Sequence, residues 1–468
     1  MLAESEEELF ERWLEQSGST YWKREHVLTE AFSKAEWSRT SWVESANEPG
    51  CGFPLQSLPY CIGAGPHRRG RIGVGVGIGA FILDLRTCHG ARLLEQLSAQ
   101  ILAACEANTL NALMACEPPA HAALRTRLMA LLDEAADEST RAAVGDALTP
   151  RADATLLKPV ESANYTDFYA SIHHATRVGR LFRPDDPLLP NYKHVPIGYH
   201  GRASSVVVSG TPVRRPHGQT SPSQAGGIPG FGPAGFLDYE VEVGLYVATA
   251  NPLGEPIPIR HAANHIFGLS LLNDWSARDI QAWENQPLGP FLAKSFATSV
   301  SPWVVPMAAL APFRVPAALR SQADPSPLAY LLDATDQSTG AINLTVEVWL
   351  LTPSMRNDGQ PPHRLSQANL SDLYWTPAQL FAHHTSNGCN LLTGDLVATG
   401  TVSGPADESA GCLLELTVGG RQPIALPDGE TRSSLQDGDE VFLRGFCRRA
   451  DFPDVSLGEC SGVVLPAL

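Results

Sequence analysis

The sequence predicts an α+β fold that is mainly β, and two features of its pattern predict this class. From residue 157 onward, short runs of β-branched residues alternate with Gly and Pro, as at 205–210. Between residues 90 and 150, Ala and Leu instead recur at helical spacing. We therefore expect a sheet-rich domain that is preceded by a region with several helices.

The chain has 468 residues, which is enough for two or three domains. The change of pattern places a domain boundary near 150–157. The expected organisation is a helical N-terminal extension (1–45), an N-terminal domain with helices (46–155) and a C-terminal domain (156–468). An apolar stripe at residues 9, 10, 13 and 14 predicts the helix of the extension, which we expect to pack on the body or on a second subunit. The alternative is an arm that docks a partner.

Composition excludes several classes of protein. The formal net charge is −16, and Lys and Arg form no cluster, so no nucleic-acid partner is expected. No run of eighteen apolar residues occurs, so no membrane span is expected. The nine cysteines include no CxxC pair, which favours neither a zinc ribbon nor a disulfide framework. A reducing cytoplasm is the simplest compartment.

Glycine alternates with β-branched residues at 71–79, within a region (50–90) that is typical of strands. No helix pattern follows these glycines, so the segment is not a phosphate-binding loop. It predicts a strand with one bare face that allows close approach of a neighbour. Further elements are predicted as strands at 344–350, 395–399, 413–418 and 440–446, helices at 276–285 and 376–385, and a loop at 226–233.

The stretch 238–247 alternates polar and apolar residues, which is typical of a half-buried strand. Its apolar face would hold Tyr239, Val241, Val243 and Leu245. Glu240 and Glu242 would share the other face with Asp238, about 7 Å apart. Two nearby carboxylates repel each other, and a Ca²⁺ or Mg²⁺ ion would remove that repulsion. The alternative is a solvated acidic face on an edge strand.

Six segments in order resemble the fumarylacetoacetate hydrolase family. They are Tyr-Thr-Asp-Phe-Tyr (165–169), Pro-Ile-Gly-Tyr-His-Gly-Arg-Ala-Ser-Ser (196–205), Leu-Asp-Tyr-Glu-Val-Glu (237–242), Asn-Asp-Trp-Ser-Ala-Arg-Asp-Ile-Gln (273–281), the glycine-rich 394–404 and the C-terminal Val-Leu-Pro-Ala-Leu. The resemblance covers about residues 50–468. It implies an SH3-like β-barrel domain followed by a β-roll catalytic domain, and a homodimer. It also implies metal-dependent hydrolysis of a carbon–carbon bond in a small diketo acid, 4-fumarylacetoacetate, in the last step of tyrosine and phenylalanine breakdown.

The resemblance also implies a role for each matching residue. The metal site would comprise Asp167, Glu240, Glu242 and Asp274, with Lys294 and Thr298 beside them. The catalytic residues would be His174 as general base, Glu415 as its orienting partner, and Arg278, Gln281 and Lys294 as stabilisers of negative charge. The substrate would be held by Tyr169, Arg183, Tyr199 and Thr401. The sequence departs from the family at Asn285, where Tyr is frequent, and at Ala297, where Gly is usual.

These residue types suit the chemistry. A histidine can accept a proton from water near neutral pH, and a carboxylate on its other nitrogen fixes the tautomer. Arg278 and Gln281 are three residues apart, so both would lie on one helical face and could donate to a developing oxyanion. Arg183 offers a fork that fits a carboxylate.

Each residue also has a plain structural alternative. His174 could be a hydrogen-bonded structural histidine, Asp274 a helix N-cap, Arg278 the partner of another acid and Glu415 a solvated strand residue. Two other functions compete at the level of the whole chain. One is a relative of different activity, such as an acylpyruvate hydrolase or a decarboxylase. The other is a non-catalytic module that binds a divalent cation, which would not need His174, Glu415 and Lys294.

Overall fold

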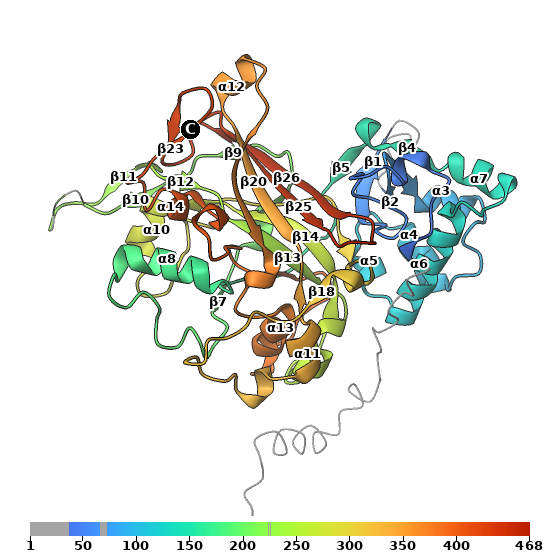
Figure 1. Cartoon of the computed structure of the whole chain (residues 1–468), viewed down its shortest axis with the longest axis horizontal. Coiled ribbons are helices and arrows are strands. Elements are labelled where there is room, and N and C mark those ends of the chain that lie inside the picture. The colour runs from blue at the N-terminus through green and yellow to red at the C-terminus, as the bar shows by residue number, and fades with distance from the viewer. Residues whose placement is uncertain (1–36, 66–72, 223, 225) are drawn as a thin grey trace, which may run out of the picture.

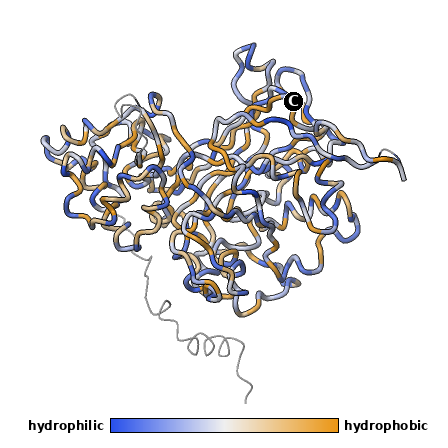
Figure 2. Tube along the Cα trace, turned by 180° about the vertical axis from the view of Figure 1, so that it is seen from behind, coloured by the Kyte–Doolittle hydropathy of each residue, from blue (hydrophilic) through white to orange (hydrophobic). Residues whose placement is uncertain are grey.

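The computed structural model describes residues 37–65, 73–222, 224 and 226–468, which form two domains (Figure 1). Seen from behind, the domains are two lobes of unequal size (Figure 2). Most of the predicted extension 1–45 lies outside the described residues. In its described part, Trp37 is buried against Phe313, and Ser41 forms a β-bridge with Asp133. The predicted helix is therefore wrong for residues 39–43, which are not helical.

The N-terminal domain contains a five-stranded antiparallel sheet and a group of helices. The strands in spatial order are β4 (Leu148–Pro150), β3 (Phe81–Asp84), β2 (Gly73–Ile78), β1 (Tyr60–Ala64) and β5 (Thr155–Leu157). The helices are α3 (Leu85–Gly90), α4 (Ala99–Cys105), α5 (Asn111–Met114), α6 (Pro118–Leu132) and α7 (Glu138–Gly145). Both the strand at the glycine repeat and the helices over 90–150 are therefore confirmed.

The bare face of β2 is used for contact between the domains. A Cβ atom on Gly77 would lie 2.8 Å from Phe53 and 3.0 Å from Trp303 of the C-terminal domain. The rings of Phe53 and Trp303 meet edge to face, with centroids 4.7 Å apart. Next to them, the backbones of Tyr60 and Val304 exchange two hydrogen bonds of 2.8 Å. Glycine is needed at position 77 because any side chain would push this junction apart.

The C-terminal domain is built on two sheets. The larger one contains, in spatial order, β7 (Gly198–His200), β6 (Tyr165–Phe168), β22 (Leu396–Ala398), β13 (Val241–Val247), β14 (Ile266–Asp274), β16 (Thr298–Val300) and β8 (Val206–Val208), with β17 (Val305–Pro306) also paired to β14. The smaller one contains β21 (His363–Asn369), β20 (Thr345–Leu351), β25 (Glu440–Cys447), β26 (Val455–Leu465) and β9 (Val213–Arg214). The mainly β class with helices is therefore confirmed.

Strand β13 lies inside the larger sheet, and the alternation that predicted it is confirmed. Val241, Val243 and Leu245 pack with residues of the smaller sheet in one core. Tyr246, on the opposite face, packs in the core of the N-terminal domain. Both faces are thus buried, so the expectation of a half-buried strand is wrong, and so is the alternative of a solvated edge strand.

Two other sequence expectations are wrong. Residues 230–233 are not loop, because β11 (Gly230–Pro233) pairs with β10 (His217–Thr220) in a hairpin. Residues 413–418 are not a strand but contain the short helix α14 (Leu413–Leu416). The helix forms because buried Asp238 accepts hydrogen bonds from the first two backbone N–H groups, those of Leu413 (2.8 Å) and Leu414 (3.0 Å). The helices predicted at 276–285 and 376–385 are confirmed as α10 (Arg278–Glu284) and α13 (Pro377–Thr385).

Candidate active site

Four buried carboxylates meet at one end of the larger sheet. Asp167 lies on β6, Glu240 directly before β13, Glu242 on β13 and Asp274 at the end of β14. Each offers an oxygen atom, and these four oxygens all lie within 4.8 Å of one another. Asp274 does not cap α10, whose N-cap is Ala277, so that alternative is wrong. Residues more than a hundred positions apart in the chain thus form one acidic cluster.

The cluster holds more negative charge than its neighbours balance. Both oxygens of Glu242 and Oδ1 of Asp167 are buried without a hydrogen-bond partner. Burial and the nearby carboxylates raise the pKa of Glu242 and the pKa of Asp167 well above their ordinary values. Buried polar atoms are seldom left without a partner, and a hard divalent cation satisfies such oxygens. The four residues therefore fit a hard divalent metal ion.

Two cations lie on one side of the cluster. Lys294 Nζ donates hydrogen bonds to Glu240 and to Asp274 Oδ2, the latter at 2.8 Å. Arg278 Nη1 lies 2.7 Å from Glu240 Oε1. Burial alone would raise the pKa of Glu240, but Arg278 and Lys294 outweigh it and hold that pKa below its ordinary value. Glu240 and Asp274 are therefore the paired members of the cluster, whereas no described ion pair involves Glu242.

Two hydroxyl groups also contact these carboxylates. Thr298 Oγ1 donates to Asp274 Oδ1 at 3.1 Å. The Tyr199 hydroxyl lies 3.0 Å from Asp167 Oδ2 and 2.8 Å from Asp274 Oδ2. Tyr199, predicted as a substrate contact, therefore also orients two of the predicted metal ligands.

His174 and Glu415 form a buried pair beside the cluster. His174 lies in the first turn of α8 (Ile172–Phe182), where the N-cap Ser171 accepts from its backbone N–H. Its Nδ1 is 2.6 Å from Glu415 Oε1, and its Nε2 is 3.9 Å from Glu240 Oε1. His174, Glu415 and the carboxylates thus form one continuous site, and Glu415 is not the solvated residue of the alternative.

Arg278 and Gln281 lie on one face of α10, as their spacing predicts. Arg278 Nη1 donates to Gln281 Oε1 at 3.1 Å, which leaves the Gln281 amide N–H groups available. Arg278 Nε donates to Asp238 Oδ2 at 2.8 Å, while Nη2 is buried without a partner. The alternative that Arg278 pairs with another acid is therefore correct, since it pairs with Asp238 and Glu240. Its Nη2 nitrogen nevertheless remains available to bind a ligand.

Three other residues were predicted as substrate contacts, and only one of them, Tyr169, has a described contact with His174. The Tyr169 ring meets the His174 ring edge to face, with centroids 5.3 Å apart. Thr401 is buried, and it follows Gly400, whose positive φ of 77° lets the loop approach Phe168. Arg183 is exposed and donates to the Pro187 carbonyl at 3.0 Å. Among the described contacts, none joins Arg183 to the carboxylate cluster.

Sequence analysis missed three partners of Glu415, one of which is the Cys412 thiol, whose sulfur lies 3.4 Å from Oε1. Ser403 Oγ donates to Glu415 Oε1 at 2.8 Å, and Arg177 Nη1 lies 3.3 Å from Glu415 Oε2. Burial would raise the pKa of Glu415, but His174, Ser403 and Arg177 together hold it below its ordinary value. Arg177 follows His174 by three residues on a helix, and that spacing is the signal that could have found it.

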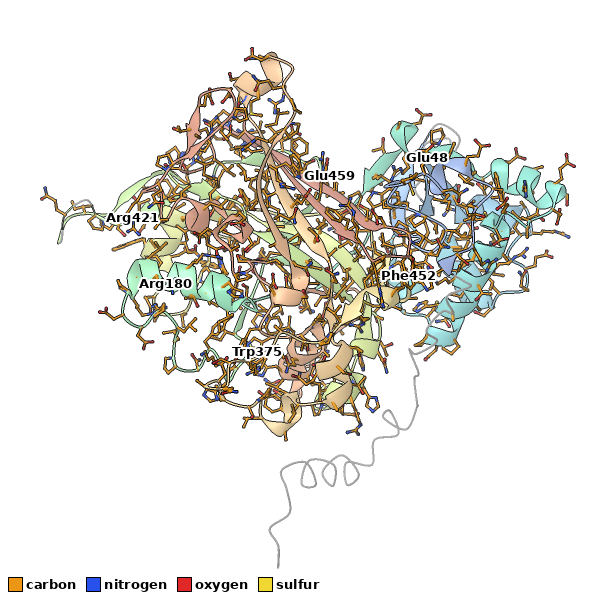
Figure 3. The ribbon with its side chains drawn as sticks, viewed as in Figure 1. Glu48, Arg180, Trp375, Arg421, Phe452 and Glu459 are labelled. Carbon is orange, nitrogen blue, oxygen red and sulfur yellow. The ribbon has the colours of Figure 1, made fainter. Side chains whose placement is uncertain are left out.

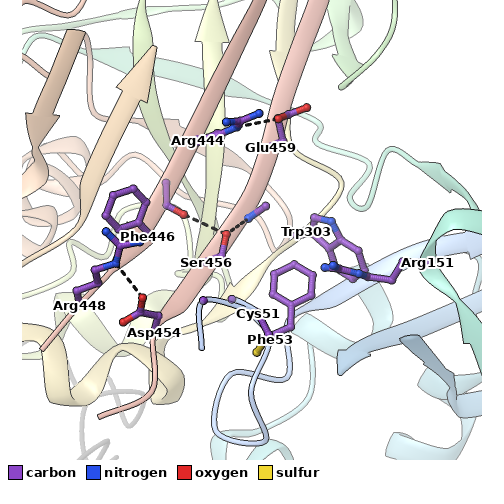
Figure 4. Close-up of a pocket in the computed structure, with 14 residues that line it drawn as sticks. Cys51, Phe53, Arg151, Trp303, Arg444, Phe446, Arg448, Asp454, Ser456 and Glu459 are labelled. Atoms are coloured by element: carbon purple, nitrogen blue, oxygen red, sulfur yellow. Dashed lines mark hydrogen bonds and ion pairs between the residues drawn. The ribbon is translucent and has the colours of Figure 1, made fainter. Parts of the chain in front are cut away.

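A separate cavity of about 420 Å³ lies where the two domains meet (Figure 4). Its walls include Phe53, Arg151, Trp303 and the ion pairs Arg444–Glu459 and Arg448–Asp454. None of the predicted site residues lines it.

Comparison with known proteins covers both domains. The family model for the Fumarylacetoacetate (FAA) hydrolase C-terminal region matches residues 163–461, and that for the Fumarylacetoacetase N-terminal region matches residues 56–159. A fumarylacetoacetase from Oryza sativa is 44% identical over 93% of this chain and 100% of its own. Those from Homo sapiens (45%) and Caenorhabditis elegans (46%) each match 89% of this chain and 97% of their own. The chain belongs to the fumarylacetoacetate hydrolase family.

Proposed function

We propose that this protein hydrolyses a carbon–carbon bond of 4-fumarylacetoacetate and releases fumarate and acetoacetate, the last step of tyrosine and phenylalanine breakdown. The observation that carries the proposal is the His174–Glu415 pair, whose free nitrogen faces the four-carboxylate cluster at 3.9 Å. Identity of 44–46% to fumarylacetoacetases over most of both chains supports the same activity. A module that only binds a cation would not need this base.

The cation-binding part of the proposal assigns Asp167, Glu240, Glu242 and Asp274 as ligands of Ca²⁺ or Mg²⁺, with Thr298 supporting Asp274. Such an ion would supply a Lewis acid for the two oxygens of the diketone. Lys294 is also assigned to this part of the site. The carboxylates raise its pKa despite burial, so it is an ammonium without a free lone pair and acts as donor and counter-charge.

His174 starts the reaction in this mechanism. Its Nε2 accepts a proton from water, and the water oxygen bonds to the carbonyl carbon of the fumaryl group. Glu415 holds Nδ1 and favours the imidazolium that results. The carbon–carbon bond then breaks, its electron pair leaves with the acetoacetate fragment as an enolate, and that fragment takes up the proton that His174 accepted from water.

Three donors stabilise the negative charge that develops. Arg278 offers its unpartnered Nη2, Gln281 its amide N–H groups and Lys294 its one remaining ammonium hydrogen. Arg278 and Lys294 are already held by Glu240, so they need little reorganisation at the moment of reaction.

The substrate contacts complete the proposal. Tyr169 and Thr401 would line the space beside His174, and Tyr199 would reach it from the edge of the carboxylate cluster. Arg183 would pair with the terminal carboxylate, because its planar fork matches that group. Its present bond to a backbone carbonyl must then be exchanged for the substrate.

We also propose a homodimer in the cytoplasm. Exposed apolar side chains gather on the β10–β11 hairpin and after α10, among them Ile228, Phe231, Leu288 and Phe291, and a second copy could cover them. All nine cysteines are free, which suits a reducing compartment. Among the described helices, none combines the length and the apolar character that a membrane crossing requires. Sedimentation of wild-type protein and of a Phe231→Ser variant tests the dimer, since the variant should dissociate more readily.

The function is tested by following fumarylacetoacetate spectrophotometrically and identifying both products. An acylpyruvate serves as the competing substrate. Fumarate and acetoacetate in equal amounts, with at least a hundredfold preference in kcat/KM over the acylpyruvate, is the expected result. A preference for the acylpyruvate, or release of carbon dioxide, would assign the chain to a different activity within the family.

A further inference from the structure

We propose that Arg177 is a positioning residue that holds Glu415 and the 403–406 loop in place for His174. This inference rests on the proposed function, because it concerns the base of that reaction. Arg177 does not contact the carboxylate cluster in the described contacts, and it would act only through Glu415 and the loop.

The first part of the argument is the fork of Arg177. Nη1 lies 3.3 Å from Glu415 Oε2, the oxygen that His174 does not use. Nη2 donates to the backbone carbonyls of Pro405 at 3.1 Å and Ala406 at 2.7 Å. One guanidinium therefore joins the Glu415 carboxylate to the 403–406 loop. A lysine would have only one nitrogen for these three acceptors.

The second part is the loop itself. Ser403 Oγ donates to Glu415 Oε1, and its carbonyl accepts from Ser171 Oγ, the N-cap of the helix that carries both His174 and Arg177. Thr401 precedes this contact by two residues. Arg177 thus closes a ring of bonds that runs from α8 through the loop to α14 and back to α8.

The third part is charge and access. The Glu415 side chain is completely buried, whereas that of Arg177 is 17% exposed. Oε1 already accepts from Ser403 Oγ and from the Cys412 thiol, whose sulfur is 3.4 Å away, whereas Arg177 alone contacts Oε2 among the described contacts. Without Arg177, that buried oxygen would be left unpaired and the carboxylate would be free to turn. Arg177 occupies Oε2 and so leaves Oε1 directed at His174 Nδ1. Because Arg177 reaches the surface, its replacement should leave the fold intact.

The test compares Arg177→Gln with Arg180→Gln. Arg180 lies one turn further along α8 and is exposed, so its replacement removes the same charge from the same helix (Figure 3). We expect Arg177→Gln to lower kcat at least fivefold with KM changed less than threefold, and Arg180→Gln to stay within twofold of wild type in both. Arg177→Lys should keep more than Arg177→Gln, and guanidinium ion should restore part of the kcat of Arg177→Ala.

Three outcomes would overturn the assignment. They are a loss of kcat below fivefold in Arg177→Gln, an equal loss in Arg180→Gln, and an Arg177→Ala enzyme that guanidinium does not improve. If Arg177→Gln unfolds, Arg177→Lys and the rescue of Arg177→Ala decide the question. If wild-type protein does not cleave fumarylacetoacetate, the proposed function fails. The role of Arg177 is then tested independently by comparing crystal structures of wild-type protein and Arg177→Gln. Arg177→Gln should show Glu415 turned from His174, and an unchanged 2.6 Å contact would reject the inference.

Discussion

Two buried carboxylate sites in this protein differ in whether the surrounding residues satisfy the carboxylate. Asp439 is fully buried and receives Arg432 through two hydrogen bonds of 2.8 and 3.0 Å, together with the Gln436 backbone N–H. Glu242 is equally buried, yet neither of its oxygens has a partner, and three other carboxylates surround it. A carboxylate that supports the fold is satisfied within the fold, whereas an unsatisfied group of them indicates an external ligand.

The difference also separates stability from function. The Arg432–Asp439 pair joins neighbouring segments of the C-terminal domain and needs nothing else. The acidic cluster destabilises the metal-free chain, because like charges at about 4 Å repel by about 4 kcal/mol at an effective dielectric near 20. Changes in the acidic cluster should therefore lower activity and raise the stability of the metal-free protein. Changes in the Arg432–Asp439 pair should lower stability and leave activity unchanged.

The largest effect should come from the cluster. Asp274→Asn or Glu242→Gln should abolish turnover and weaken calcium or magnesium binding, because each removes an anionic ligand. Glu242→Gln should at the same time raise the melting temperature in EDTA, since it removes one repelling charge. Activity assays, calorimetry and thermal unfolding check these outcomes, and a Glu242→Gln protein with normal turnover would remove the cluster from the reaction.

The next largest effect should come from the His174–Glu415 pair, which lies beside the acidic cluster. His174→Ala should lower kcat about 10²- to 10⁴-fold, the usual range for general-base catalysis, and leave the metal ligands in place. Glu415→Gln should lower kcat with little change in KM. The double variant should lose much less than the product of the single losses, since the two residues act as one unit. Strictly multiplicative losses would mean that another base activates the water.

Part of this site could be predicted from the sequence, because the alternation of residues along one strand depends only on neighbouring positions. Alternation along 238–247 predicted that Glu240 and Glu242 share a face. The same pattern could not reveal that β13 is buried on both faces, because that depends on distant sheets and on the N-terminal domain. It also missed the separate role of Asp238, which binds Arg278 and holds α14 from 175 residues away.

The strand expected at 413–418 was wrong for the same reason. A four-residue helix carries almost no sequence signal and depends on its partner for stability. Glu415 was nevertheless assigned from the family resemblance, because a role can be inherited by motif when the local structure cannot be predicted. The domain limits 46–155 and 156–468 stay predictions, although β5 pairs with β1 and so extends the N-terminal sheet to residue 157.

A smaller and purely structural effect should follow from the satisfied pair. Asp439→Asn removes the buried ionic partner of Arg432, which keeps only the partly exposed Glu430 at 2.7 Å, and should reduce the free energy of unfolding by about 3 kcal/mol. Metal affinity and kcat of the folded fraction should stay within twofold of wild type. Denaturant unfolding and calorimetry measure both quantities, and a loss of metal binding in this variant would erase the distinction between the two carboxylate sites.

The smallest effect should be at the edge of the site. Arg183→Lys should raise KM several-fold and leave kcat nearly unchanged, because a point charge replaces a bidentate fork. The control is Arg180→Gln on α8, the helix that ends directly before Arg183, and this variant should leave KM within twofold. Equal turnover of a neutral ester analogue by wild-type protein would show that no residue here binds the terminal carboxylate.

The most direct test of the central claim is a titration of metal-stripped wild-type protein with Ca²⁺ or Mg²⁺, followed by calorimetry and by turnover of fumarylacetoacetate on the same samples. The account predicts negligible turnover without metal, one binding event per chain in the acidic cluster, and activity that rises in proportion to its occupancy. The same titration of Glu242→Gln should show weakened binding and no recovery. Full turnover by protein that is verified to be free of metal would contradict the account.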